Sequence, residues 1–316
     1  MRNFFNVEAS EEDVEIDSSN ALVALEQADA LFEVEYKAAT FEKDGRIHRP
    51  VYEKGKNEGK PLYHWVVRGD TGEALGLHSG RYAKLPSYRF LGETAETVFP
   101  NSTSEVRVWD RGERVALIQE ISEPVDLGGG DTIQPHVIWV SSFNGQWATA
   151  VHSLTNRMWC LNQLVSVPLL KVRHTINHTE LFKFRVQVVE AARERAAIQA
   201  TMARTLKDQN FTDAEFLALV RDIVPLPPKP LEGEIHAKAQ NLVDKKRKGM
   251  ITRWEAECEH WGVKNKWLAY NAVQGTEQHL LHGRGESQEE KELASLAKAI
   301  DDKTPLAKRA LVALNA

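Results

Sequence analysis

The sequence predicts an α+β protein, in which an antiparallel β-hairpin sheet with flanking helices is followed by an all-helical C-terminal region. Two observations predict this fold class. Apolar residues alternate in short segments around Gly- and Asn-containing turns through the first ~180 residues, as hairpins do. After that the apolar spacing becomes helical, and no strand–helix–strand alternation indicates a parallel sheet. We expect an acidic, loosely held segment at 1–18, an α+β domain at 19–180, and a helical region at 181–316 with a Pro-rich break at 224–233.

The α+β domain is expected to begin with a helix and a strand. Residues 18–20 (Ser-Ser-Asn) can cap a helix that ends near Leu31. Alternating residues predict a strand at 32–41. The Gly-containing segment 43–61 is expected to be a long basic loop. A hairpin is predicted next, with strands at 63–68 and 73–78 around Gly69-Asp70-Thr71-Gly72.

Two further hairpins are predicted in the second half of this domain. A helix at 88–98, ended by Pro100, comes before them. Their strands are expected at 105–109 with 114–121, and at 136–143 with 146–152 around an Asn144-Gly145 turn of type I′. The segment NRMWCLNQLVSV (156–167) is expected to be a helix, followed by a short strand at 169–174.

Helical spacing accounts for the rest of the chain. Residues 182–207 form a long amphipathic pattern, and Thr212-Asp213-Ala214-Glu215 has the composition of a capping box. The proline-rich segment VPLPPKPLEG then predicts a linker. Further helices are expected at 235–260, 265–282 and 287–300, with a last one after Pro305.

Composition excludes several classes of protein. The chain has 316 residues, of which 42% are hydrophobic and 27% charged, as in soluble globular proteins. Two cysteines are too few for a disulfide scaffold and fit a reducing compartment. No apolar run is long enough to span a membrane, and the acidic N-terminus does not have the pattern of a signal peptide. The formal net charge is −5, but residues 1–33 carry nine acidic residues and one basic residue, so the remainder is net positive.

No motif for enzyme chemistry is found. The phosphate-binding patterns GxxxxGK[ST] and GxGxxG are missing, as are G-x-S-x-G, C-x-x-C and H-E-x-x-H. Pairs such as His279 and His282, three residues apart, could share a helix face, but no third ligand is evident. We therefore expect no metal and no cofactor, and leave enzyme activity uncertain, with a non-enzymatic role favoured.

Basic residues interleaved with aromatic residues form the more coherent signal. Single-stranded nucleic acid binds to such combinations, because phosphates pair with Lys and Arg while bases stack on flat side chains. The alternative is that most of these Trp and Tyr residues belong to the core. As candidate contacts for nucleic acid we select Arg81, Lys84, Arg157, Asn162, Lys171, Arg173 and His174.

Four segments also occur in a recognisable order: VVRGDTGEALGLHSGRY, SSFNGQWATAVHSLTNRMWCLNQL, LKVRHTINHTELFKF and NKWLAYNAVQGTEQHLLHGRG. Together they resemble the phage/plasmid-like protein family, a domain of unknown function, and the resemblance runs from about residue 20 to the C-terminus. Its more distinctive parts are R-H-T-x-N and W-x-A-Y-N-A-V. The resemblance implies a mobile-element protein in the cytoplasm of a host cell.

A similarity at the level of the predicted fold implies a more specific function. A helix, antiparallel hairpins and a helix carrying Arg157 to Asn162 look similar to the core of single-strand annealing recombinases. The analogy implies a phage-encoded, non-enzymatic homo-oligomer that binds single-stranded DNA and assists annealing or recombination. The alternative is a phage protein-interaction or assembly factor without nucleic-acid binding, whose acidic N-terminal segment engages a phage or host protein.

Overall fold

The structure is a computed structural model that describes residues 20–80, 82, 84–158, 162–172, 185–227, 237–280, 287–301 and 303–315. The chain divides into two compact units, each of which is described by itself. The first unit takes its residues from 1–123, 135–154 and 166–195. The second takes them from 124–134, 155–165 and 196–316, so the chain passes between the units several times.

The first unit contains a small antiparallel sheet with the strand order β1-β4-β5. Its strands are β1 (Val34–Ala38), β4 (Tyr63–Arg68) and β5 (Ala74–Ser79), and the helix α1 (Ala21–Gln27) comes before them. Strands β4 and β5 form the hairpin that the Gly-containing turn predicts, with a register shift at Val66/Val67. Asn20 caps α1, as expected, because its side chain accepts hydrogen bonds from the backbone N–H groups of Leu22 and Val23.

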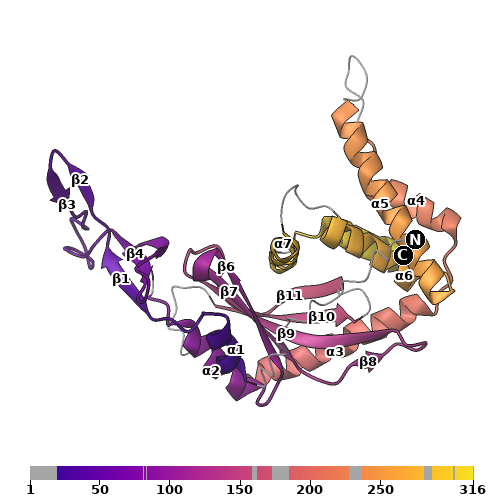
Figure 1. Cartoon of the computed structure of the whole chain (residues 1–316), viewed down its shortest axis with the longest axis horizontal. Helices are drawn as coiled ribbons and strands as arrows, with labels where there is room; N and C mark the ends of the chain where they lie inside the picture. Colours follow the sequence, from indigo (N-terminus) through magenta and orange to yellow (C-terminus); the bar gives the residue numbers. More distant parts are fainter. Residues whose placement is uncertain are drawn as a thin grey trace. The chain divides into compact units, whose positions relative to one another are not determined.

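A two-stranded ribbon follows β1 in the same unit. It consists of β2 (Phe41–Lys43) and β3 (Arg46–His48), which lie at the left end of the chain trace in Figure 1. Asp44 and Gly45 form the turn, with φ angles of 52° and 71°. Positive φ at both central residues is the requirement of a type I′ turn, which suits a two-residue hairpin. The expectation of an irregular loop over 43–61 is therefore wrong at its start.

A larger antiparallel sheet has the order β11-β10-β9-β7-β6, with β8 paired to β9. Its strands are β6 (Ser104–Trp109), β7 (Arg114–Glu120), β8 (Val125–Asp126), β9 (Thr132–Ser142), β10 (Thr149–Arg157) and β11 (Asn162–Val172), and the short turn η1 (Asp110–Gly112) joins β6 to β7. The predicted hairpins at 105–121 and 136–152 are present as β6–β7 and β9–β10. At the second turn only Gly145 has a positive φ, so the type I′ expectation is wrong there.

The core of the first unit lies between helices and this sheet. Leu91 and Ala95 of α2 (Tyr88–Val98) pack with Leu117, Val137 and Trp139 of the sheet. A second cluster joins the small sheet to the larger one, and it contains the rings of Phe32, Tyr88 and Phe143 together with Val66 and Val115.

Arg68 packs against this second cluster although its side chain is charged. Its guanidinium lies 4.0 Å from the ring centroid of Phe32. The guanidinium donates to both carboxylate oxygens of Asp70 at 3.0 and 2.7 Å and to Asp29 at 2.9 Å. A buried arginine with this many partners is a structural residue of the unit.

The second unit is mostly helical. Its helices are α4 (Asp213–Ile223), α5 (Ala237–Trp261), α6 (Lys266–Gly275), α7 (Gln288–Ile300) and α8 (Pro305–Asn315), with the π-helical turn η3 (Thr276–Leu280) after α6. The long helix α3 (Arg185–Lys207) contributes residues to both units. Trp254 lies in the core and stacks on Phe216 with ring centroids 4.7 Å apart. Thr212 and Glu215 form the capping box that the sequence predicts for α4.

The fold is thus mixed α+β, with antiparallel sheets in the N-terminal half and the helices α3 to α8 in the C-terminal half, which confirms the predicted class. One expected element is wrong. Residues 156–157 and 162–167 belong to strands β10 and β11 instead of a helix, because pairing within a six-stranded sheet outweighs local helical preference. The acidic segment 1–18 lies outside the described residues.

Candidate nucleic-acid interface

One face of the small sheet exposes large apolar side chains. Strand pairing places Trp65 opposite both Lys37 of β1 and Leu77 of β5, and Tyr63 lies two residues before Trp65 on the same face. The relative exposure is 47% for Tyr63, 40% for Trp65 and 48% for Leu77. We call Tyr63, Trp65 and Leu77 the aromatic row. Contiguous exposed apolar surface of this kind marks a binding site more often than isolated apolar residues do.

The two rings of the aromatic row are exposed and have no ring partner among the described residues. Among the described residues, neither Tyr63 nor Trp65 makes a side-chain hydrogen bond or a ring contact. Trp and Tyr side chains that are part of a core usually pack against other rings or find a hydrogen-bond partner. A flat ring that is exposed and without a ring partner is what stacking of an unpaired base requires.

The ribbon β2–β3 presents a second set of exposed side chains. Its register pairs Phe41 with His48 and Lys43 with Arg46, and all four side chains lie on one face because they alternate with Glu42 and Ile47. We call these four the ribbon face. The rings of Phe41 and His48 are stacked, with centroids 5.3 Å apart and an interplanar angle of 16°. Both cations are exposed.

A group of cations lies at the end of the small sheet, on the face opposite the aromatic row. Burial lowers the pKa of His64 first, and the positive charges of Lys84 and Arg49 lower it further. The Lys84 ammonium lies 5.4 Å from the ring centroid of Tyr36, whose hydroxyl donates to the Leu85 carbonyl at 3.2 Å. Lys84, one of the predicted contacts, is therefore an exposed cation in the same group as Arg49.

The remaining predicted contacts do not all join this region. Lys171 is exposed on β11 in the first unit. Arg81, Arg173 and His174 lie outside the described residues. Arg157 and Asn162 belong to the second unit.

Arg157 is fully buried and bonded to carboxylates. Its guanidinium donates to both oxygens of Asp131, at 2.8 and 2.9 Å, and to Glu257 at 2.8 Å. Asp131 and Glu257 are themselves 1% exposed. A guanidinium enclosed in this way does not face solvent, so the expected contact between Arg157 and a phosphate does not fit this structure. Its role here is to join β10 to α5 and to the segment before β9.

Asn162 is also buried, on β11. Its amide donates to the backbone carbonyl and to the side-chain oxygen of Asn271, both at 3.1 Å, and lies 3.2 Å from the ring of His279 through its oxygen. Trp267, four residues before Asn271 on α6, donates to Asp131 at 2.9 Å. Two residues of the distinctive W-x-A-Y-N-A-V segment thus hold this buried polar cluster, which we define as Asp131, Arg157, Asn162, Glu257, Trp267 and Asn271. The i, i+4 spacing of Trp267 and Asn271 is the signal in the sequence that points to it.

The buried polar cluster has one polar atom without a bonding partner. Glu257 gives one carboxylate oxygen to Arg157, while its other oxygen is buried and has no hydrogen-bond partner. Burial raises the pKa of Glu257, and the charge of Arg157 opposes this effect. Among the described residues, no group of three or more His, Cys, Asp or Glu side chains could hold a metal ion. The hydrogen bonds of the cluster connect β10, β11, α5 and α6 within the second unit.

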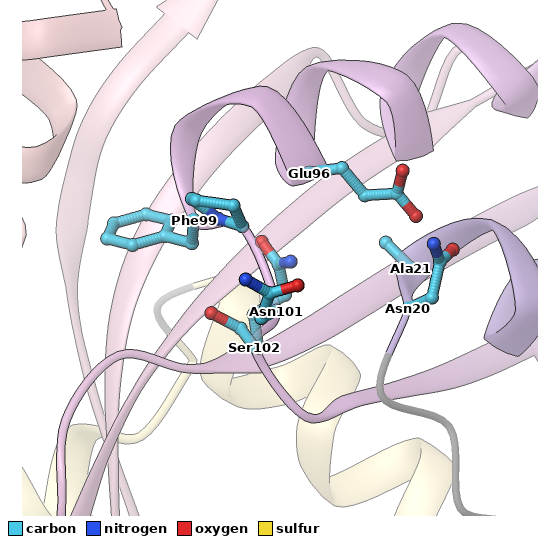
Figure 2. A pocket seen from close by; sticks show the side chains of 8 residues that line it. Asn20, Ala21, Glu96, Phe99, Asn101 and Ser102 are labelled. Atoms are coloured by element: carbon cyan, nitrogen blue, oxygen red, sulfur yellow. The ribbon is translucent and has the colours of Figure 1, made fainter.

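A pocket of about 240 Å³ lies in the first unit beside α1 and the end of α2, with Glu96, Asn101 and Ser102 around it (Figure 2). Among the described residues that line it, Glu96 is the charged one, and it accepts a hydrogen bond from the Leu22 backbone N–H at 3.0 Å. Gln119, another lining residue, accepts from Trp139 at 2.8 Å. The carboxylate of Glu96 repels phosphate, and both Glu96 and Gln119 already accept hydrogen bonds within the first unit. We therefore do not include the pocket in the candidate nucleic-acid interface.

Comparison with known families places the chain in one of them. Residues 74–301 match the family described as a domain of unknown function, DUF932. Because the match covers more than half of the chain, the protein belongs to this family. No curated protein and no solved structure matches the chain. In the part of the chain that the structure describes, no helix has the length and apolar character needed to cross a membrane.

The buried polar cluster and most of the candidate interface lie on different sides of the start of the matched segment. The buried polar cluster lies wholly within residues 74–301. The strands β1 to β4, with Tyr63, Trp65 and the ribbon face, come before it. The candidate interface is therefore carried mainly by a part of this chain that the family match does not include.

Proposed function

We propose that this protein binds single-stranded nucleic acid on the aromatic row of its first unit. The observation that carries the proposal is the exposed ring of Trp65, which stacks on no ring of the described residues and lies in the centre of a sheet face between Lys37 and Leu77. Base–aromatic stacking contributes about 1–3 kcal/mol per base and needs no particular sequence.

Cations near the row supply the phosphate contacts that such binding needs. Lys43 and Arg46 are exposed on the ribbon, and Lys54, Lys56 and Lys60 are exposed in the loop that leads to β4. Lys37 contributes less, because it is paired with the exposed Glu35 at 2.7 Å. Each phosphate neutralised by a cation releases counterions, so the affinity should fall as salt concentration rises.

The test is fluorescence anisotropy with labelled single strands of DNA and of RNA. Trp65→Ala should weaken binding by about 1–3 kcal/mol, since it removes a stacking ring from the surface. Leu242→Ala is a suitable control, because it removes an exposed apolar side chain of α5 in the second unit. Unchanged affinity in Trp65→Ala, with a melting temperature equal to that of the wild type, would contradict the proposal.

The apolar content of the row favours one other function. Leu77 is as exposed as the two rings, and Ile47 on the ribbon is 77% exposed. Apolar surface of this type also suits a protein partner, as the assembly-factor hypothesis requires. Size-exclusion chromatography with light scattering, with and without an oligonucleotide, separates the two. A stable assembly that Trp65→Ala dissolves in the absence of nucleic acid would favour the protein partner.

A role in annealing or recombination in a phage setting stays a prediction. The analogy behind it depended on a helix that carries Arg157 to Asn162, whereas these two residues lie on β10 and β11. We therefore propose single-strand binding by a homo-oligomer as the function, and annealing as a consequence to be tested once binding is established.

A further inference from the structure

The ribbon face differs from the aromatic row in one respect that matters for its ligand. The ring of Phe41 is stacked on His48 within the ribbon, so one face of each ring is already covered. The ring of Trp65 has no such partner among the described residues. An unpaired base can therefore stack on Trp65 more readily than on Phe41, and the ribbon is better suited to another kind of contact.

The shape of the ribbon indicates what that contact is. It is two strands wide, with strands about 4.8 Å apart, and the major groove of B-form DNA is about 12 Å wide and admits a two-stranded ribbon. Its turn is a tight two-residue turn at Asp44 and Gly45, so no bulky loop obstructs its tip. Lys43 and Arg46 flank this turn on the same face and are exposed.

We propose that the ribbon β2–β3 binds the major groove of duplex DNA that adjoins the bound single strand. The preferred ligand is then DNA in which a single strand continues into a duplex. This inference rests on the proposed function, because the single-stranded part occupies the aromatic row. Only two residues separate β1 from β2, and the Ala39 backbone N–H donates to the Tyr63 carbonyl at 2.9 Å, so the ribbon starts where the row ends.

Charge on the ribbon face supports a polyanion as its ligand. The four side chains of this face include two cations, one histidine and no acid. Glu42 lies on the other face, and Asp44 is the one acid in the turn. Cations that flank the turn would meet the phosphates along the edges of the groove. An RNA duplex is a poorer ligand, because its major groove is deep and narrow.

The experiment compares three labelled DNA ligands on the full-length protein at one low salt concentration. They are a single strand of about 20 nucleotides, a blunt duplex, and a duplex that carries the same single strand as a tail. We expect the tailed duplex to bind about fivefold or more tightly than the single strand, because additional phosphates are contacted. Equal affinity for the single strand and the tailed duplex would overturn the inference, as would equal affinity for the blunt and tailed duplexes.

Two charge-reversal variants assign the effect to the ribbon. Lys43→Glu with Arg46→Glu should weaken binding of both ligands and reduce the ratio of the affinities for the tailed duplex and the single strand to about one. Lys54→Glu with Lys56→Glu makes the same change of charge in the loop after the ribbon, and it should leave the ratio of the two affinities unchanged. An equal loss of the ratio in both variants would show that general charge, and not the ribbon face, causes the preference.

The two proposals fail in different ways. Trp65→Ala should weaken binding of both the single strand and the tailed duplex, while the ribbon variant should weaken the second more than the first. Absence of single-strand binding would contradict the proposed function itself. Single-strand binding that depends on Trp65, without any gain from the duplex, would contradict only the inference about the ribbon. Circular dichroism of each variant checks that the fold is retained.

Discussion

Arg157 of the second unit and two exposed cations of the first unit use their positive charges in opposite ways. In the second unit Arg157 is enclosed by Asp131 and Glu257 and has no exposed surface. In the first unit Lys84 and Arg46 are exposed, and neither forms an ion pair among the described residues. A basic residue near aromatic residues can therefore be a structural residue or a binding residue, and the carboxylates that folding brings to it decide which.

These carboxylates are distant from Arg157 in the sequence, so local sequence patterns do not predict that they pair with it. Asp131 is 26 residues before Arg157, and Glu257 is 100 residues after it. A buried arginine must have such partners, since burial of an unpaired charge is very costly. No pattern around residue 157 shows which distant acids will supply them.

The largest predicted effect concerns the stability of the buried polar cluster. Arg157→Ala leaves two buried carboxylates without their partner, and should lower the free energy of unfolding by about 3–5 kcal/mol. Lys84→Ala, at an exposed position, should change it by less than about 0.5 kcal/mol. Urea unfolding followed by circular dichroism measures both. A similar small change in the two variants would contradict the structural role of Arg157.

Protonation of Glu257 should change the free energy of unfolding by a smaller amount, and this change should depend on pH. Because its pKa is raised in the folded chain, the folded state holds the proton more tightly than the unfolded state does. The free energy of unfolding should therefore fall as pH rises from the ordinary Glu value through the raised pKa. Glu257→Gln should remove this slope, whereas Glu259→Gln, on the same helix, should retain it. Urea titrations between pH 4 and 8 provide the comparison.

Exposed cations should affect the salt dependence of binding more than the affinity itself. If Lys84 contacts a phosphate, Lys84→Gln should reduce the slope of log affinity against log salt by about one unit. Lys248→Gln changes an exposed lysine of α5 and should leave the slope unchanged. Anisotropy titrations at several salt concentrations measure the slope, and equal slopes for Lys84→Gln and the wild type would place Lys84 outside the binding surface.

The smallest expected effect is a pH dependence of binding through His64. Lys84 and Arg49 help to keep the pKa of this imidazole below its ordinary value in the free protein. His64 lies on the face opposite the aromatic row, so the effect requires a strand that extends around the edge of the small sheet. A phosphate brought to that face would favour the protonated ring, and affinity should then increase as pH falls from 7.5 to 5.5. His64→Gln should flatten this dependence. An equally steep dependence in the variant would assign the proton uptake to another group.

Local sequence patterns predicted part of the fold well. The Gly-containing turn after β4 and the capping box of α4 were both predicted from the sequence, because each depends on residues close together in the chain. Asp44-Gly45 is an equally local signal for a hairpin turn, although the sequence analysis predicts a loop over this segment. Residues 156–167 were misassigned for another reason, since their strands are stabilised by neighbouring strands of the sheet.

The candidate site was predicted as a type of surface more than as a set of residues. Tyr63 and Trp65 belong to the basic and aromatic signal, but their exposure follows from the register of β4 between β1 and β5. Alternation along β4 alone leaves open which face is buried. The burial of Val66 against Phe32 and Tyr88 decides this, and it depends on contacts between distant segments.

Photocrosslinking with a single strand that contains a photoreactive pyrimidine, followed by mass spectrometry of the peptides, locates the bound strand on the protein. We predict crosslinks at Tyr63 or Trp65, within the first unit, that disappear when unlabelled single strand competes for the site. Crosslinks confined to residues 155–165 or 196–316 would contradict the account, because they would place the nucleic acid on the second unit.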